Sequence, residues 1–223
     1  MKRIVIVGAG FHGSELYSYL IDLSAHDTSV EFAGFADDRE PPNAFAKAWS
    51  LGHIEDLCLR LATAANMEYG YITAAGDNKF RRELVKHVEN LRLPNLSPWT
   101  LQHPRALVGH EVEIGEGTCL APGAIVTTRT TIGRHCILNV HSSVSHDCVV
   151  GDYVNINPGA TVCGNVCIRE GSYIGAGATI KDKVSIGEWS VIGAGAAVVC
   201  DIPARVTAVG VPARIIKHHE GAA

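Results

Sequence analysis

Residues 168–198 read IREGSYIGAGATIKDKVSIGEWSVIGAGAAV, and an aliphatic residue recurs at every sixth position. The same register continues without insertion back to Val108, and the residue two positions before each aliphatic is small or β-branched. The aliphatic positions are Val108, Ile114, Leu120, Val126, Ile132, Leu138, Val144, Val150, Ile156, Val162, Ile168, Ile174, Ile180, Ile186, Ile192 and Val198. Residues two apart on a strand point to the same face of it. Each six-residue repeat therefore predicts one short strand with two inward side chains.

Three such six-residue repeats would close one triangular coil of about 18 residues, and stacked coils would bury a continuous aliphatic column. The alternative is an antiparallel sandwich, whose strands would not keep a six-residue register over this length. The pattern therefore predicts a parallel β-helix. A glycine often follows the aliphatic residue, and we expect it to permit the tight corner. These glycines are Gly109, Gly115, Gly133, Gly151, Gly175, Gly187 and Gly193.

The chain before residue 98 has no six-residue register. It alternates predicted strands (3–8, 31–38 and 69–75) with predicted helices (13–23, 54–65 and 79–91). The last helix carries a stripe of Phe80, Leu84, Val88 and Leu91. Such alternation is typical of a parallel sheet with helices, a Rossmann-like α/β domain. Pro94 and Pro98 mark the predicted boundary, giving domains 1–97 and 98–223.

A G-x-G-x-x-G motif at residues 8–13 follows the first strand and opens the first helix. Glycines let the backbone approach a phosphate, which the positive end of the helix attracts. Asp37 and Asp38 follow the second strand, where a ribose hydroxyl could bind, and residues 76–78 reach the same edge. The direct interpretation is NAD binding, but fewer than about 100 residues leave room for one mononucleotide-binding half. Alternatively, the glycines only turn the chain and Asp37 only caps a helix.

The composition excludes several other classes of protein. The net charge is −4 and no basic run stands out, which argues against nucleic acid. Only four apolar residues precede Gly8, and no run reaches membrane-spanning length, so neither secretion nor a membrane is expected. Seven cysteines without a Cys-x2-Cys pair indicate a reduced, cytoplasmic protein. Cys163 and Cys167 could hold zinc, but small side chains at repeat positions explain them more simply.

His146 and Asp147 lie at a predicted corner, two residues after the inward Val144. A histidine beside a carboxylate is a credible general base. A lone histidine at a corner is more often a solvated side chain, and the pattern alone favours that interpretation.

The chain resembles bacterial hexapeptide acyltransferases of the NeuD/PglD family, which acetylate sialic acid or nucleotide-linked amino sugars. The resemblance spans about residues 2–217 and rests on five motifs. They are GAGFHG at residues 8–13, GFADD at 34–38, AGDN at 75–78, SHDC at 145–148 and AVGVPAR at 208–214. It implies a left-handed β-helix, a homotrimer with active sites between subunits, and acetyl-CoA as co-substrate without a metal. Left-handedness departs from the usual crossover rule, and spacing alone does not predict it.

The resemblance also assigns roles to residues. His146 matches the general base, Asp147 the acid that orients it, and Gly164 the backbone amide that holds the thioester oxygen. The positions matching the acetyl-CoA site are Ala176, Gly177, Ala194, Gly195, Val211 and Pro212. The positions matching the nucleotide-sugar site are Gly8, Gly10, Phe11, His12, Asp37, Asp38, Gly76, Asp77, Asn78, Asn139 and Asn155.

One position departs from the family pattern. Many sugar N-acetyltransferases of the family have a second histidine nine residues after the base, where this chain has Asn155. Asparagine can hydrogen-bond but cannot take up a proton. The resemblance implies N-acetylation of a nucleotide-linked 4-amino-4,6-dideoxy sugar, but Asn155 weakens the assignment to an amine acceptor, and sugar O-acetylation stays open.

Three rival functions remain. A γ-type carbonic anhydrase shares the β-helix, and His141 and His146 have its His-x4-His spacing, but Arg105 stands where the third ligand is needed. A non-catalytic sensor of sugar nucleotides would fit Asn155 but not the intact His146-Asp147 pair. Serine acetyltransferases have a helical N-terminal domain, which the alternation of strands and helices before residue 98 does not match.

Overall fold

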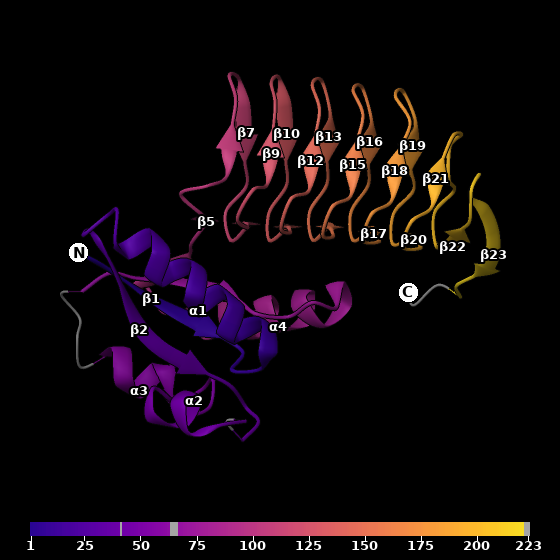
Figure 1. The fold of residues 1–223 in the computed structure, drawn as a ribbon. Helices are drawn as coiled ribbons and strands as arrows, with labels where there is room; N and C mark the ends of the chain where they lie inside the picture. Colours follow the sequence, from indigo (N-terminus) through magenta and orange to yellow (C-terminus); the bar gives the residue numbers. More distant parts are fainter. Residues whose placement is uncertain (41, 63–66, 221–223) are drawn as a thin grey trace. The chain divides into compact units, whose positions relative to one another are not determined.

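The computed structural model describes residues 1–40, 42–62 and 67–220. The chain divides into two compact units, Met1–Pro104 and Arg105–Ala223, so the division falls later than the boundary expected at residue 97. Figure 1 shows helices and a sheet in the first unit and stacked coils in the second. In the described part of the chain, no helix has the length and apolar character needed to cross a bilayer.

The first unit is a parallel sheet with strand order β2-β1-β3-β4. One core packs Val5, Val7 and Tyr71 of the sheet against Leu57 and Leu84 of the helices. The elements are β1 (Lys2–Val7), α1 (Phe11–Ser24), β2 (Val30–Ala36), α2 (Ala44–Ala48), α3 (Leu57–Ala62), β3 (Tyr69–Thr73), α4 (Asn78–Asn90), β4 (Leu96–Pro98) and β5 (Leu101–Gln102). The predicted Rossmann-like alternation is confirmed.

Three short elements of this unit, β4, β5 and α2, were not predicted. Strand β4 has three residues and ends in Pro98, which an edge strand tolerates because one side of its backbone needs no partner. Helix α2 has five residues, too few for a helical period to register. The helix predicted over 54–65 is α3, and its predicted end at residues 63–65 lies outside the described residues. Phe80, expected in the buried stripe of α4, is 49% exposed instead.

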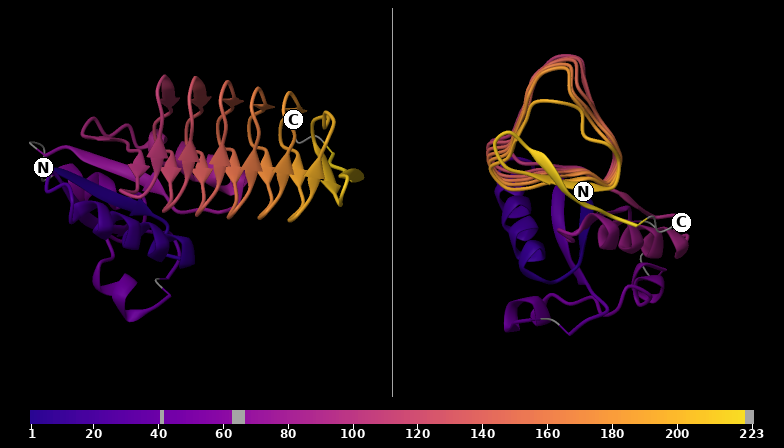
Figure 2. Two further views of the ribbon diagram at one scale, coloured as in Figure 1. Left: turned by 45° about the horizontal axis from the view of Figure 1, so that its top comes forward. Right: turned by 90° about the vertical axis from the view of Figure 1, so that its right-hand side faces the viewer.

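The second unit is the predicted β-helix, left-handed, with short parallel strands on three flat faces. Viewed along its axis in Figure 2, it has a triangular outline. The first face runs β6-β9-β12-β15-β18-β21, the second β7-β10-β13-β16-β19, and the third from β8 through β11, β14, β17 and β20 to β22 and β23. We call the turns from the first to the second face the first corner, from the second to the third the second corner, and from the third to the first the third corner.

Each strand of one coil pairs in register with the strand 18 residues later, as Ile137 pairs with Asn155. The strands are β6 (Leu107–Val108), β7 (Val112–Ile114), β8 (Cys119–Leu120), β9 (Ile125–Val126), β10 (Thr130–Ile132), β11 (Ile137–Leu138), β12 (Ser143–Val144), β13 (Val149–Val150), β14 (Asn155–Ile156), β15 (Thr161–Val162), β16 (Cys167–Ile168), β17 (Tyr173–Ile174), β18 (Thr179–Ile180), β19 (Ser185–Ile186), β20 (Val191–Ile192), β21 (Ala197–Val198), β22 (Val206–Val209) and β23 (Arg214–His218). The final pair, β22 and β23, is antiparallel.

The glycines after the aliphatic residues do not make the corners, contrary to the expectation from sequence. The residue with positive φ comes three positions after the aliphatic, as at Glu111, Arg129 and Asp147, where φ is 55°, 48° and 58°. Glycine follows the aliphatic residue for a different reason. A Cβ at Gly175, for example, would meet the backbone of Gly193 and Ala194 in the next coil, because the coils stack so closely.

We expect Ile180→Ala to lower the free energy of unfolding by about 2–5 kcal/mol, since it leaves a cavity in the aliphatic column. Ile180 is fully buried in the main core of the β-helix. Its neighbour Thr179 is exposed on the same strand, so Thr179→Ala is the matched control and should change stability by less than about 0.5 kcal/mol. Denaturant unfolding measures both, and equal effects would contradict an inward Ile180.

Candidate active site

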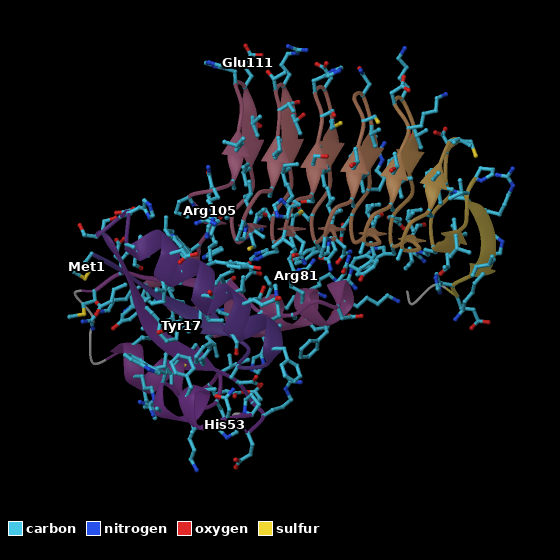
Figure 3. All side chains as sticks on the ribbon, viewed as in Figure 1. Met1, Tyr17, His53, Arg81, Arg105 and Glu111 are labelled. Carbon is cyan, nitrogen blue, oxygen red and sulfur yellow. The ribbon has the colours of Figure 1, made fainter. Side chains whose placement is uncertain are left out.

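A chain of three side chains joins two coils at the first corner of the β-helix. His146 Nδ1 lies 2.7 Å from Asp147 Oδ2. Arg129, one coil earlier, donates from Nε to Asp147 Oδ1 at 2.7 Å and from Nη2 to Oδ2 at 3.0 Å. The register of the coils supplies this contact, because the Asp147 amide donates to the Thr128 carbonyl at 3.1 Å. Figure 3 labels Glu111, which lies at the tip of the same corner one coil before Arg129.

These contacts fix the charge of Asp147. Hydrogen bonds from Arg129 and then from His146 lower the pKa of Asp147 to about 2, so this carboxylate is ionised throughout the neutral range. The Asp147 carboxylate raises the pKa of Arg129 in return. An ionised carboxylate only accepts hydrogen bonds, so the proton between the pair belongs to His146 Nδ1. In a neutral ring, Nε2 then carries the lone pair and can take up a proton.

The His146 ring lies against Gly164, which is 18 residues later and so one coil further along. A Cβ added at Gly164 would lie 2.5 Å from Cε1 and 2.7 Å from Nε2 of His146. Gly164 does not have positive φ, so the ring, and not the backbone conformation, excludes a side chain there. Within the described residues, no hydrogen bond uses the Gly164 amide N–H, which leaves this donor available close to Nε2.

The positions expected to meet acetyl-CoA lie elsewhere on the β-helix. Ala176 and Gly177 follow β17, and Ala194 and Gly195 follow β20, all at the third corner. The exposed Val211 and its neighbour Pro212 lie close to them, because the Ala197 amide donates to the Gly210 carbonyl and the Ala197 carbonyl accepts from Ala213. The structure thus brings these six positions together, but not with His146 in the same chain.

The two expected acceptor residues of the β-helix are also apart from His146. Asn139 lies at the third corner, where its Oδ1 accepts from the Val140 amide at 2.7 Å. Asn155 is the outward residue of β14 on the third face, between Ile137 and Tyr173 of the neighbouring coils. His141 lies at the third corner as well, so the His-x4-His spacing does not place His141 and His146 at one corner.

In the first unit, the three glycines of the G-x-G-x-x-G loop serve different purposes. Gly8 has a φ of 112°, which side chains rarely adopt, and a Cβ at Gly13 would overlap the Gly8 carbonyl. Gly10 has an ordinary φ of −74° and nothing within 4 Å of an added Cβ. Neither the backbone conformation nor local packing therefore requires a glycine at position 10. The role expected for Gly10, to leave room for a phosphate as the middle glycine of this motif, stays a prediction.

Some of the other residues that follow β1 and β3 are exposed, and others are buried or cap a helix. Phe11 is 95% exposed at the start of α1, and His12 Nδ1 contacts Glu15 Oε2 at 3.0 Å. Gly76, like Gly10, has open space where a side chain would be. Asp77 caps α4 by accepting from the Phe80 amide at 2.8 Å. Asn78, the first residue of that helix, is buried.

The two aspartates after β2 also differ. Asp37 accepts from the Ala9 amide at 2.7 Å and from the amide and guanidinium of Arg39. Burial alone would raise the pKa of Asp37, but these hydrogen bonds outweigh burial and hold it below its usual value. Asp37 therefore joins the ends of β1 and β2. Asp38 accepts from the Ile54 amide at 2.9 Å and lies nearer to solvent.

Asp37 and Asp38 line a cavity of about 260 Å³ together with Gly8, Arg39, Phe80 and His87. The guanidinium of Arg39 lies 5.9 Å from the centre of the Phe80 ring, which is cation–π distance. The cavity combines aromatic, charged and open backbone surface, as small-molecule sites do. The exposure of Phe80 follows from its place in this wall.

One group of three potential metal ligands occurs among the described residues, formed by Asp38, Glu55 and His87. His87 Nε2 already pairs with Glu55 Oε1 at 2.9 Å, and both carboxylates are exposed. Cys163 and Cys167 are free cysteines and belong to no such group among the described residues. Burial raises the pKa of the Cys148 thiol, which fits packing in the core.

Comparisons with known proteins agree with these features. The family model of the PglD N-terminal domain matches residues 3–88. WeeI from Acinetobacter baumannii is 31% identical, with 97% of this chain and 100% of that chain covered and a TM-score of 0.83. The chain belongs to the NeuD/PglD family. The predicted class of enzyme, an acyltransferase, and the predicted fold are thereby confirmed.

Two further members of the NeuD/PglD family have solved complexes. The acetyltransferase domain of PglB from Neisseria gonorrhoeae, in complex with acetyl coenzyme A, is 30% identical, with 96% of this chain and 99% of that chain covered and a TM-score of 0.82. PerB from Caulobacter crescentus, in complex with CoA and GDP-perosamine, is 28% identical, with 97% and 98% covered and a TM-score of 0.81. No curated protein matches the chain.

Sequence reasoning missed Arg129. Its signal was present in the sequence, because Arg129 lies 18 residues before Asp147, one full coil of the predicted β-helix.

Proposed function

We propose that the chain transfers the acetyl group of acetyl-CoA to the amino group of a nucleotide-linked amino sugar of the 4-amino-4,6-dideoxy type. The observation that carries the proposal is the pairing of His146 with an ionised Asp147 above the unused amide of Gly164. PglB in complex with acetyl coenzyme A and PerB in complex with CoA and GDP-perosamine support the choice of donor and acceptor.

The neutral amine attacks the thioester carbonyl and forms the new C–N bond. His146 Nε2 takes the proton from nitrogen, while Asp147 holds Nδ1–H and stabilises the charged ring. The Gly164 N–H donates to the oxygen that becomes negative in the tetrahedral intermediate. The intermediate collapses by breaking the C–S bond, and the proton on His146 passes to the CoA sulfur. No covalent acyl-enzyme is needed.

We further propose a homotrimer with active sites between subunits. The separation of the proposed roles supports it, because the base is at the first corner and the acetyl-CoA positions are at the third corner of one chain. A neighbouring subunit could supply the missing corner to each site. We also propose a cytoplasmic location, where free thiols such as the exposed Cys200 stay reduced.

Sugar O-acetylation is the second candidate, and Asn155 is the observation that favours it. Asn155 stands where many N-acetyltransferases of the family have a second histidine, and an asparagine cannot relay a proton. An amine that starts as an ammonium must lose one proton before it attacks and a second afterwards, whereas a hydroxyl acceptor loses one proton in all, which His146 alone can take up.

A thiol-release assay tests the proposal. Acetyl-CoA is offered with UDP-, GDP- and TDP-linked amino sugars and, in parallel, with free sialic acid. Thiol release with one nucleotide amino sugar would support N-acetylation and identify the nucleotide. Release with a hydroxyl acceptor alone would move the chain to the O-acetyltransferases, and release with none would overturn the proposed acceptors.

We expect Gly10→Ala to raise KM for the nucleotide sugar about tenfold or more while thermal stability stays nearly unchanged. The added Cβ meets nothing in the free protein but would occupy the space that the bound phosphates need. Gly13→Ala is the contrasting variant, because its Cβ overlaps the Gly8 carbonyl and should destabilise the first unit. An unchanged KM in Gly10→Ala would contradict phosphate binding at this loop.

A further inference from the structure

Both oxygens of the Asp147 carboxylate accept a hydrogen bond from Arg129. Oδ1 accepts from Arg129 Nε alone, whereas Oδ2 accepts from Arg129 Nη2 and also contacts His146 Nδ1. Two parallel N–H···O bonds from a guanidinium fix the plane of a carboxylate, which a single hydrogen bond does not. Asp147 needs this support because its side chain is 34% exposed and, among the described residues, His146 is the one other side chain that hydrogen-bonds to it.

We propose that Arg129 is a positioning residue of the acyltransferase site, which holds Asp147 in the orientation that fixes the His146 ring. This inference rests on the proposed role of His146 as the base. Arg129 itself does not need to touch either substrate. It acts on the reaction through Asp147.

Arg129 is the cation that lies against Asp147 at this corner. The other charged residues of the corner are Glu111 before Arg129 and Lys181, Asp182, Lys183 and Asp201 after Gly164. Its other titratable residues are His110, Cys148, Cys163 and Cys200. Glu111 also acts on Arg129, but less strongly than Asp147 does.

Arg129→Met should lower kcat about tenfold, with KM for both substrates changed less than about threefold. Arg129→Lys keeps the charge but not the two parallel bonds, so it should recover only part of kcat. Lys183→Met removes a cation three coils further along the same corner, and it is the matched control for charge.

A double-mutant cycle separates this inference from the proposed function. With Asp147→Asn in place, Arg129→Met should cause little further loss of kcat, because Arg129 acts through Asp147. If His146→Ala is inactive while Arg129→Met matches wild type in kcat, the role of Arg129 is wrong and the base assignment stands. If His146→Ala stays active, the proposed function itself fails. Additive losses in the cycle would also overturn the inference.

Discussion

His146→Ala is expected to lower kcat/KM by about 10²–10⁴-fold, the usual loss when a general base is removed. The reason lies in the contacts of the ring. Asp147 fixes Nδ1–H, and Nε2 lies against Gly164, so the site has one basic nitrogen in one orientation. His146 is half exposed at a corner, so its loss should hardly change the free energy of unfolding. Steady-state thiol release with the best acceptor of the panel measures the effect.

His110→Ala is the matched control for this variant. His110 lies at the same corner two coils earlier and is exposed, and its hydrogen bonds to Thr128 and Arg129 use only its backbone carbonyl. It should retain activity close to wild type. Turnover of His146→Ala within a few-fold of wild type would refute the base. Equal losses in both variants would indicate a general effect of changes at this corner.

The regularity of the β-helix could be predicted because the same six-residue period places an inward aliphatic side chain on every strand. Ile156, Ile174 and Ile192 occupy equivalent places, and each is fully buried. The corner conformation could not be predicted, because residues as different as Glu111, Arg129 and Tyr153 adopt positive φ there. A hydrogen-bonded turn tolerates that conformation when the neighbouring coils hold it on both sides, so residue type carries little signal.

In the first unit, element length decided what could be predicted from the sequence. Long periodic elements such as α4 were predicted almost to the residue, while the three residues of β4 gave no period to detect. The roles of Asp37 and Asp77 were predicted from their position at the sheet edge. Yet both carboxylates bind backbone amides of the chain itself, Ala9 and Phe80. Sequence position brings a polar group to an edge, but only the geometry shows which partner already occupies it.

Gly164→Ala is expected to lower kcat/KM by about 10²-fold or more, although it adds one methyl group. The new Cβ would lie within 2.7 Å of two atoms of the His146 ring, which is below any real contact distance for a Cβ. The ring must therefore turn away, and in turning it loses the 2.7 Å contact with Asp147. Stability should change little, because Gly164 has an ordinary φ and the half-exposed ring can move into solvent.

The variant keeps the backbone N–H at position 164, so a loss of activity reports on the ring and not on a missing oxyanion donor. Cys163→Ala changes the preceding side chain and leaves both the ring and the amide in place, and we expect near wild-type activity from it. In the His146→Ala background there is no ring to displace, so Gly164→Ala should then have almost no further effect. A full additional loss in that background would instead mean that the methyl group obstructs the thioester. The ring and the amide would then be separate requirements at this corner, and Gly164 would have to stay unsubstituted for the substrate as well as for the base.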